Sequence, residues 1–130
     1  VLILTGGDDS TLRRTVELKI ASRMLDQRKP IIGVCHGCFL LTDVLGGEVA
    51  DVIGHVDTSH TVNYFGDPMV VNSYHSLGIQ KLHRSGTELA TDPEGNCEAW
   101  IDGNLAGIVW HPERMVLPWI PDEIQCLIDK

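Results

Sequence analysis

A cysteine in a glycine-flanked turn is the first residue whose setting favours chemistry. Residues 33–37 read GVCHG and join an apolar run at 31–34 to a helix-like segment at 38–45. This pattern is typical of a nucleophile elbow, whose tight turn holds the central side chain at the edge of a sheet. The helix dipole behind Cys35 would lower the pKa of its thiol and favour the thiolate. The pattern predicts that Cys35 is a nucleophile and that the backbone N–H of His36 faces the developing oxyanion.

A histidine and a glutamate two residues apart supply the partners that such a cysteine needs. Residues 110–113 read WHPE and come at the end of an apolar run at 105–110. A thiol nucleophile needs a general base, which His111 can provide, and a carboxylate such as Glu113 can orient the imidazole. Side chains at i and i+2 of an extended chain project to the same side, so His111 and Glu113 can touch. We therefore expect a catalytic triad of Cys35, His111 and Glu113.

A third glycine-rich turn follows the first apolar run of the chain. Residues 5–7 read TGG and come directly after residues 1–4, which read VLIL. Two glycines allow the backbone to approach a ligand closely and to turn an N–H toward it. The carboxyl ends of parallel strands meet at one edge of a sheet, so this turn is expected beside Cys35 and His111. The backbone N–H of Gly7 is the candidate for a second oxyanion donor.

The elements that position these residues alternate between strand-like and helix-like segments, which indicates an α/β fold. Apolar residues at i, i+4 spacing predict a helix from about residue 11 to residue 29, capped by Ser10 or Thr11 and ended by Pro30. The terminal segment 122–129 is the other expected helix. No linker or repeat is visible, so we expect one domain over residues 1–130. The further expected strands lie at 61–65, 69–72, 88–91, 97–101 and 105–110, with hairpin turns at 92–95 and 102–104.

Composition argues against several other classes of function. The chain has 10 Lys and Arg against 18 Asp and Glu, a formal net charge of −8. This acidic balance argues against a nucleic-acid partner and against an anionic membrane surface. No apolar stretch reaches the roughly 18 residues of a membrane-spanning helix, and the N-terminal residues lack the pattern of a signal peptide. Four cysteines are too few for a disulfide scaffold, so we expect a cytoplasmic protein.

Together these motifs resemble the class I, triad-type glutamine amidotransferase superfamily. The order TGG, GxCxG, YHS at 74–76 and WHPE spans nearly the whole chain. Within the superfamily, the chain looks most like the γ-glutamyl hydrolase branch, which includes hydrolases of γ-glutamyl-GABA and γ-glutamyl-CDP-amidate. The resemblance implies a flavodoxin-like three-layer sandwich around a central, mostly parallel sheet. The residues that suggest the branch are Gly54 and His55, residues 71–75 (VNSYH), Glu98 and Ala99, and residues 107–114 (GIVWHPER).

The resemblance also implies a reaction and a role for each matching residue. Cys35 would attack the γ-carbonyl of glutamine or of another γ-glutamyl amide, and the resulting thioester would be hydrolysed by water. His111 would move the protons, Glu113 would orient His111, and the N–H groups of Gly7 and His36 would form the oxyanion hole. This chemistry needs no metal and no organic cofactor. The residues expected to contact the substrate are Gly6, Phe39, Tyr74, His75 and Ser76.

The sequence departs from the superfamily pattern in two places. Many members have glutamine four residues after the nucleophile, whereas this chain has Phe39. Relatives also have a sizeable segment before the TGG strand, so the usual N-terminal strands are expected to be missing here. A synthetase partner or a second copy of the chain would then cover the open edge.

Several alternatives remain beside this interpretation. The chain could be the glutaminase subunit of a two-part amidotransferase, or an inactive interaction module of the same fold. Cys35 and Cys38 form a C-x-x-C pair, which is also typical of a redox dithiol, although that chemistry requires neither the flanking glycines nor WHPE. A zinc site made from this pair with His55 or His60 is not expected, because no second close ligand pair accompanies it. His83 is expected to be exposed to solvent.

Overall fold

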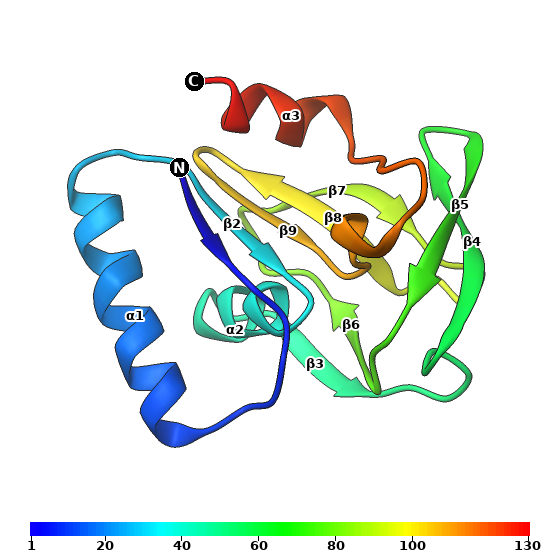
Figure 1. The fold of residues 1–130 in the computed structure, drawn as a ribbon, viewed down its shortest axis with the longest axis horizontal. Coiled ribbons are helices and arrows are strands. Elements are labelled where there is room, and N and C mark those ends of the chain that lie inside the picture. The colour runs from blue at the N-terminus through cyan, green and yellow to red at the C-terminus, as the bar shows by residue number, and fades with distance from the viewer.

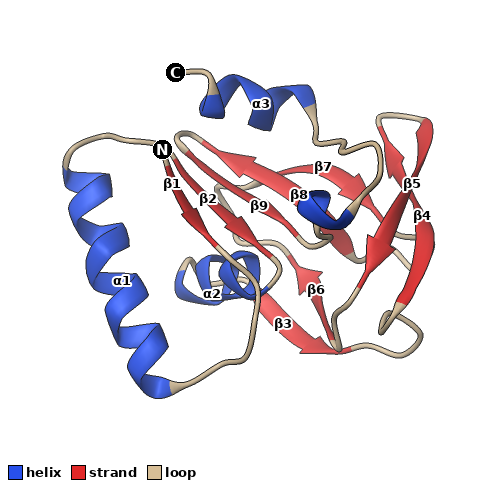
Figure 2. Cartoon of the chain, in the orientation of Figure 1, coloured by secondary structure: helices blue, strands red, loops and turns tan.

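One nine-stranded mixed sheet runs through the centre of the molecule, with helices on both of its faces (Figures 1 and 2). The computed structural model describes all residues from 1 to 130. None of its helices is long and apolar enough to cross a membrane. In chain order the elements are β1 (Leu2–Leu4), α1 (Thr11–Asp26), β2 (Ile31–Val34), α2 (His36–Val44), β3 (Glu48–Asp51), β4 (Thr58–Tyr64), β5 (Asp67–Ser73), β6 (Leu77–Lys81), β7 (Thr87–Thr91), β8 (Cys97–Asp102), β9 (Leu105–Ile108), the 3₁₀ turn η1 (Pro112–Arg114) and α3 (Asp122–Ile128).

Three strands of this sheet are parallel and carry the chain segments of greatest interest. The main strand order is β1-β2-β9-β8-β7-β4-β5, and β1, β2 and β9 run parallel to one another. The pairings from β9 through β8, β7 and β4 to β5 are antiparallel. The expected parallel sheet is thus present as a three-stranded unit within a mixed sheet. The carboxyl ends of β1, β2 and β9 lead directly into the TGG, GVCHG and WHPE segments.

Buried side chains form two hydrophobic clusters, one on each face of the sheet. Successive residues of β2 point to opposite faces, so Ile31 belongs to one cluster and Ile32 to the other. The first cluster includes Phe39 and Leu41 of α2, and the second includes Ile124 of α3. This three-layer arrangement confirms the expected α/β, flavodoxin-like fold.

The expected elements are found with shifts at their ends, and two strands were not anticipated. Ser10 caps α1 as expected, because its side chain accepts a hydrogen bond of 3.1 Å from the backbone N–H of Arg13. The strands β3 and β6 were missed. They are short, carry charged and polar residues, and pair mainly with each other at one side of β8. Without an alternating apolar face, such strands have no strong sequence signal.

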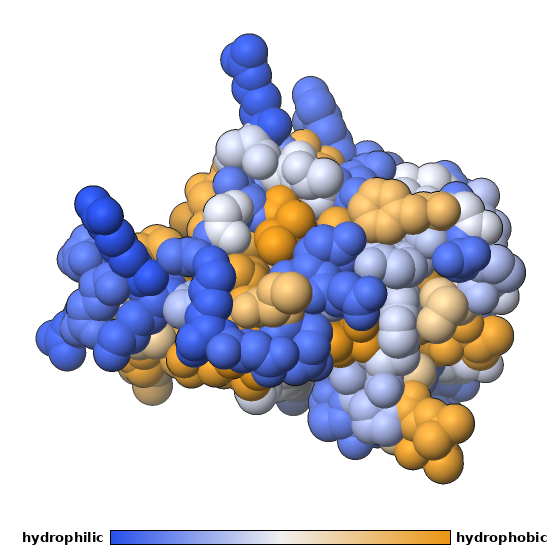
Figure 3. Space-filling view, turned by 90° about the horizontal axis from the view of Figure 1, so that it is seen from above, coloured by the Kyte–Doolittle hydropathy of each residue, from blue (hydrophilic) through white to orange (hydrophobic).

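The apolar side of α1 lies mostly open. Leu12 is 75% exposed, Val16 and Ile20 are also exposed, and Ala21 alone is buried among the residues of this helix. Elsewhere, apolar side chains also reach the surface in patches between polar ones (Figure 3). Helix α1 is therefore held at the edge of the sheet by few buried contacts.

Candidate active site

Cys35 sits in a strained turn between β2 and α2. Its backbone has φ 51° and ψ −106°, a conformation rare for residues other than glycine. A Cβ atom on Gly33 would lie 2.4 Å from the carbonyl of Gly37, and one on Gly37 would lie 2.3 Å from the carbonyl oxygen of Leu4. Both glycines are thus required for backbone packing. The backbone N–H of Cys35 donates to Ile108 of β9 at 2.8 Å, which fixes the turn against the neighbouring strand.

His111 and Glu113 are in direct contact after the end of β9. Nδ1 of His111 lies 2.5 Å from Oε1 of Glu113, as the i, i+2 spacing predicted. The imidazole is buried, whereas the Glu113 side chain is 58% exposed. Because the carboxylate accepts a hydrogen bond from Nδ1, Nε2 carries the free lone pair.

Gly6 lies beside both Cys35 and His111. A Cβ atom built on Gly6 would lie 3.3 Å from Nε2 and 2.5 Å from Cε1 of His111. The same atom would lie 3.4 Å from Cβ of Cys35. The TGG turn after β1 therefore leaves room for the thiol and the imidazole to face one another.

Asn72 is a second support of His111 to which sequence reasoning gave no role. Its side-chain oxygen accepts from the backbone N–H of His111 at 2.8 Å, and its amide donates to the His111 carbonyl at 2.7 Å. This double hydrogen bond ties the WHPE segment to β5. An asparagine that bonds a remote backbone segment leaves no local spacing pattern, so sequence offered no signal for it.

Burial has the largest effect on the pKa of the Cys35 thiol. Burial raises the pKa of the Cys35 thiol above its ordinary value. The backbone N–H of His36 and the guanidinium of Arg114 act in the opposite direction but are weaker. The expectation of a lowered pKa is therefore wrong for the free protein. The thiol stays protonated at neutral pH and needs a base to activate it.

This raised pKa predicts a specific pH dependence of Cys35 alkylation. In a Cys126→Ala background, the rate with iodoacetamide should climb about tenfold per pH unit, because only the thiolate reacts. It should show no plateau near about pH 8.5, where ordinary thiols level off. Peptide mass spectrometry of quenched samples would measure the rate, with a small model thiol as the control. A plateau below neutral pH would show that a thiolate is already formed and would contradict the structure.

Arg13 of α1 shapes the TGG turn and was not anticipated. Its guanidinium donates to the carbonyl oxygens of Thr5 at 2.8 Å, Gly6 at 3.0 Å and Asp8 at 3.1 Å. Glu17 holds the same guanidinium through Nε at 2.9 Å. In a trans peptide the N–H points opposite to the carbonyl. Binding of the Gly6 carbonyl by Arg13 therefore directs the N–H of Gly7 away from Arg13.

The other residues expected to touch a substrate lie in different settings. Tyr74 is partly exposed, with its ring centre 5.9 Å from that of His111 and 4.7 Å from the guanidinium carbon of Arg114. Phe39 is buried and packs on His75 at 5.9 Å between ring centres. The backbone N–H of His75 donates to His55, and the carbonyl of Ser76 accepts from Val52. Tyr74 thus borders His111. Phe39, His75 and Ser76 instead make contacts that hold the chain around Tyr74 in place.

Cys38 and His83 are both buried. Cys38 lies on α2 and is fully buried in the core, and burial raises the pKa of its thiol strongly. It is therefore placed as a small core residue and not as an exposed redox partner of Cys35. The expectation that His83 is exposed is wrong. His83 is buried, because its ring packs edge-on against Trp100 at 4.6 Å and its Nε2 faces Asp102 at 3.2 Å.

Potential metal ligands gather at a different place from the one considered in the sequence. Neither Cys35 nor Cys38 belongs to a group that could hold a metal ion. His55 and His60 instead come together with His75 and Glu98. His60 lies on β4 and His55 in the loop before it.

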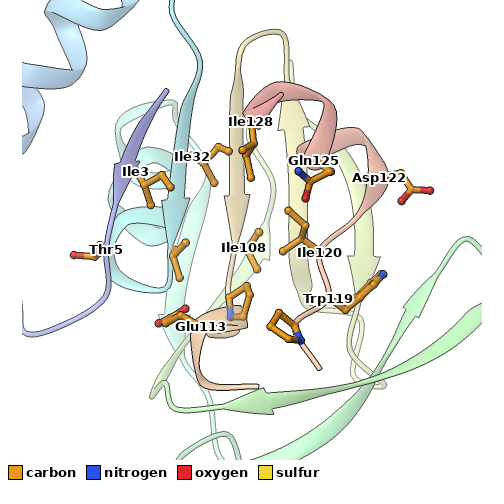
Figure 4. Close-up of a pocket in the computed structure, with 13 residues that line it drawn as sticks. Ile3, Thr5, Ile32, Ile108, Glu113, Trp119, Ile120, Asp122, Gln125 and Ile128 are labelled. Carbon is orange, nitrogen blue, oxygen red and sulfur yellow. The ribbon is translucent and has the colours of Figure 1, made fainter. Parts of the chain in front are cut away.

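A cavity of about 540 Å³ lies on the α3 face of the sheet, behind Glu113 (Figure 4). Isoleucines of β1, β2, β9 and α3 point into it, together with Trp119. Neither Cys35 nor His111 lines this cavity. Thr5, Pro112 and Glu113 do line it, so the cavity adjoins the segments that carry the candidate site.

Comparison with known proteins identifies the family of this chain. The model of the glutamine amidotransferase class I family matches residues 1–122. This chain belongs to the class I glutamine amidotransferase family. The amidotransferase fold explains why three strand ends carry the candidate site, and solved structures show the same fold. A glutamine amidotransferase from Thermotoga maritima superposes with a TM-score of 0.74 and 20% identity, over 85% of this chain and 56% of that one.

Relatives with described functions match most of this amidotransferase chain, but the match covers a smaller share of their own length. The γ-glutamyl-CDP-amidate hydrolase of Campylobacter jejuni is 27% identical over 124 residues, which cover 87% of this chain and 62% of the relative. One subunit of the glutamine-hydrolysing GMP synthase of Natronomonas pharaonis is 28% identical, over 86% of this chain and 65% of the relative. The chain therefore spans less than two thirds of the length of these relatives.

Proposed function

We propose that this protein hydrolyses a γ-glutamyl amide bond through a glutamyl thioester on Cys35. The observation that carries the proposal is the proximity of Cys35 and His111 to the same point: a Cβ atom built on Gly6 would lie 3.4 Å from Cβ of Cys35 and 3.3 Å from Nε2 of His111, whose Nδ1 contacts Glu113. The family match and the similarity to a γ-glutamyl-CDP-amidate hydrolase support the same bond type. The raised pKa of the Cys35 thiol fits a nucleophile that is activated by its base only when substrate is present.

The proposed reaction has two halves with the same proton carrier. Nε2 of His111 takes the thiol proton as the sulfur of Cys35 bonds to the γ-carbonyl carbon. When the tetrahedral intermediate collapses, the C–N bond breaks and His111 gives that proton to the leaving nitrogen. Water then attacks the thioester and gives a proton to His111, which returns it to the departing thiolate as glutamate leaves. Glu113 stabilises the imidazolium that forms in each half.

The oxyanion of each intermediate would be bound by two backbone amides. The N–H of His36 lies at the start of α2, directly after the nucleophile, where the helix dipole also favours negative charge. The N–H of Gly7 is the proposed second donor. Its direction is set by Arg13, because the guanidinium holds the Gly6 carbonyl on the opposite side. Arg13 is thus a proposed positioning residue that does not itself touch the substrate.

Replacing Arg13 should reduce turnover more than substrate binding. Arg13→Ala frees the carbonyls of Thr5 and Gly6, so the Gly7 peptide can rotate. Loss of one oxyanion donor lowers kcat by about 10²–10³-fold, and an indirect displacement should give about 10–100-fold with KM changed much less. Steady-state kinetics would separate the two constants. Arg14→Ala is the matched control, because Arg14 lies on the same helix and only pairs with Asp43 at the surface. A kcat equal to that of Arg14→Ala would contradict the assigned role.

The decisive test of the proposed function is covalent trapping. The protein would be incubated with 6-diazo-5-oxo-L-norleucine, a γ-glutamyl electrophile, and its intact mass measured. One adduct is expected in the wild type and in Cys126→Ala, which removes an exposed thiol. No adduct is expected in Cys35→Ala. If no adduct forms while iodoacetamide still alkylates Cys35, the thiol is accessible but no γ-glutamyl pocket exists, and the proposal fails.

A glutaminase component of a larger enzyme is the second candidate, because a subunit of glutamine-hydrolysing GMP synthase is among the relatives. Such a component would deliver ammonia from glutamine to a synthetase partner. A free hydrolase turns over γ-glutamyl amines by itself, whereas a glutaminase component would be nearly silent alone. Release of ammonia from glutamine and of amine from γ-glutamyl amines, measured on the isolated chain, distinguishes the two. Phe39, in the position where many members have glutamine, favours a substrate other than glutamine.

A further inference from the structure

Four ligating side chains from distant parts of the sequence converge beside the candidate active site. His55 comes from the loop before β4, His60 from β4, His75 from the loop after β5, and Glu98 from β8. One ligand atom from each residue lies within 4.8 Å of the others. The β4–β5 hairpin brings His55 and His60 near His75, and the tertiary structure adds Glu98 of β8.

His55, His75 and Glu98 are buried and His60 is partly buried, and several of their polar atoms have no hydrogen-bond partner. Glu98 is 1% exposed, and neither of its carboxylate oxygens has a hydrogen-bond partner. Nε2 of His60 lies 2.8 Å from one oxygen without hydrogen-bond geometry, and Nε2 of His75 lies 3.7 Å from the other. A buried carboxylate without hydrogen bonds is strongly unfavourable unless a cation compensates it. The arrangement therefore calls for a positive charge at the centre of the cluster.

Two of the histidines are already held in the orientation that a metal ion requires. Nδ1 of His75 donates to the carbonyl of Leu77 at 2.5 Å, which leaves the lone pair on Nε2, facing Glu98. Nε2 of His55 faces a carboxylate oxygen of Asp92 at 3.4 Å, which leaves Nδ1 free. Asn96 fixes that carboxylate in turn with two hydrogen bonds. Outer partners of this kind set the tautomer and the ring direction of metal-bound histidines.

We propose that His55, His60, His75 and Glu98 bind a divalent transition-metal ion, for which zinc is the best fit. Three imidazoles and one carboxylate form a four-ligand set typical of zinc, and the absence of thiolates disfavours softer metals. Calcium and magnesium prefer oxygen ligands throughout. Ligands of a tetrahedral zinc ion lie about 3.3 Å from one another, given bonds of about 2.0–2.2 Å. Nε2 of His60 lies 2.8 Å from Oε1 of Glu98 and Nε2 of His75 lies 3.7 Å from Oε2, so a small rotation of the carboxylate would present one oxygen to the ion.

The bound ion would fix the segment that borders His111. Ser73 and His75 both bond to the carbonyl of His55, so the ligand loops are joined to one another. Tyr74 lies between these two residues, with its ring against His111. Because all four positions would be filled by protein, the ion holds structure and takes no part in bond breaking. Its effect on activity rests on the proposed function, whereas metal binding itself does not.

Metal binding can be measured without any assay of activity. The protein in a Cys35→Ala background would be treated with a chelator, desalted and titrated with zinc chloride by calorimetry. One equivalent is expected to bind, and zinc at 100-fold above Kd should raise Tm by about 10 °C. Cobalt should bind with the visible d–d bands of a tetrahedral site and without thiolate charge-transfer absorption. Trapping by the γ-glutamyl electrophile is a separate measurement. Failure of the zinc proposal can therefore be told apart from failure of the proposed hydrolase function.

Variants of the ligands and a matched histidine complete the test. Glu98→Gln and His60→Gln should each weaken zinc binding by about 100-fold or more and abolish the rise in Tm. Glu98→Gln removes a buried charge, so its zinc-free form should remain folded by circular dichroism. His83→Gln, a buried histidine outside the cluster, should bind zinc as the parent does. The proposal is overturned if the parent binds no zinc, or if both ligand variants bind it with unchanged affinity.

Discussion

His111→Ala is expected to lower kcat/KM for γ-glutamyl amide hydrolysis by about 10⁴-fold or more, as removal of a triad base does in other enzymes. The reason is the state of the nucleophile. Burial raises the pKa of the Cys35 thiol, so the thiolate is disfavoured and the nucleophile depends on a base to take its proton. Kinetics on a chromogenic γ-glutamyl anilide would measure the loss, and circular dichroism would show that the fold is retained.

Glu113→Gln is the companion variant, with a smaller expected loss. The amide keeps an oxygen that can accept from Nδ1 of His111 but brings no charge to stabilise the imidazolium. The Glu113 side chain is half exposed, so water screens part of that charge. A decrease of about 10²-fold is expected. If His111→Ala stayed within tenfold of the wild type, His111 could not be the base.

Gly6→Ala is expected to remove most of the activity while leaving the fold intact. The added methyl group would lie 2.5 Å from Cε1 of His111, so the imidazole must move away from Cys35. A displacement of about 1 Å between reacting groups can reduce a rate by about 10²-fold. We expect a loss of that size or larger in kcat. The atoms that must give way belong to a side chain, so thermal unfolding should change little.

Two other glycines provide controls with opposite behaviour. Gly37→Ala places a methyl group against the backbone of Leu4, which cannot yield, so this variant should fail to fold. Gly95 has φ 88° and open space around it, so Gly95→Ala strains the backbone by about 1–2 kcal/mol without touching the site. It should lower Tm and keep its activity. Equal activity in Gly6→Ala and Gly95→Ala would contradict the placement of His111 beside Gly6.

Local patterns in the sequence determined the fold class and the family. The runs at 31–34 and 105–108 are apolar throughout, because β2 and β9 are covered on both faces, and such runs are readable from sequence. The run at 1–4 is equally apolar, although Val1 and Ile3 are about half exposed. The turn at Cys35 could also be predicted from sequence, because a turn this tight excludes a Cβ atom at two fixed positions, which are therefore glycines. The contact between His111 and Glu113 was predicted from an extended chain, whereas the structure makes it across the 3₁₀ turn η1.

Only the tertiary structure decided how remote residues meet. Arg13 binds the TGG turn from a neighbouring helix, and Asn72 holds His111 from 39 positions away. The cluster of His55, His60, His75 and Glu98 joins four segments, two of them adjoining strands with weak sequence signals. The pKa of Cys35 likewise depends on how deeply the completed fold buries the thiol. Spacing along the chain predicts contacts within a turn or a strand. Burial and contacts between strands depend on how the whole sheet and its helices pack, so local spacing does not predict them.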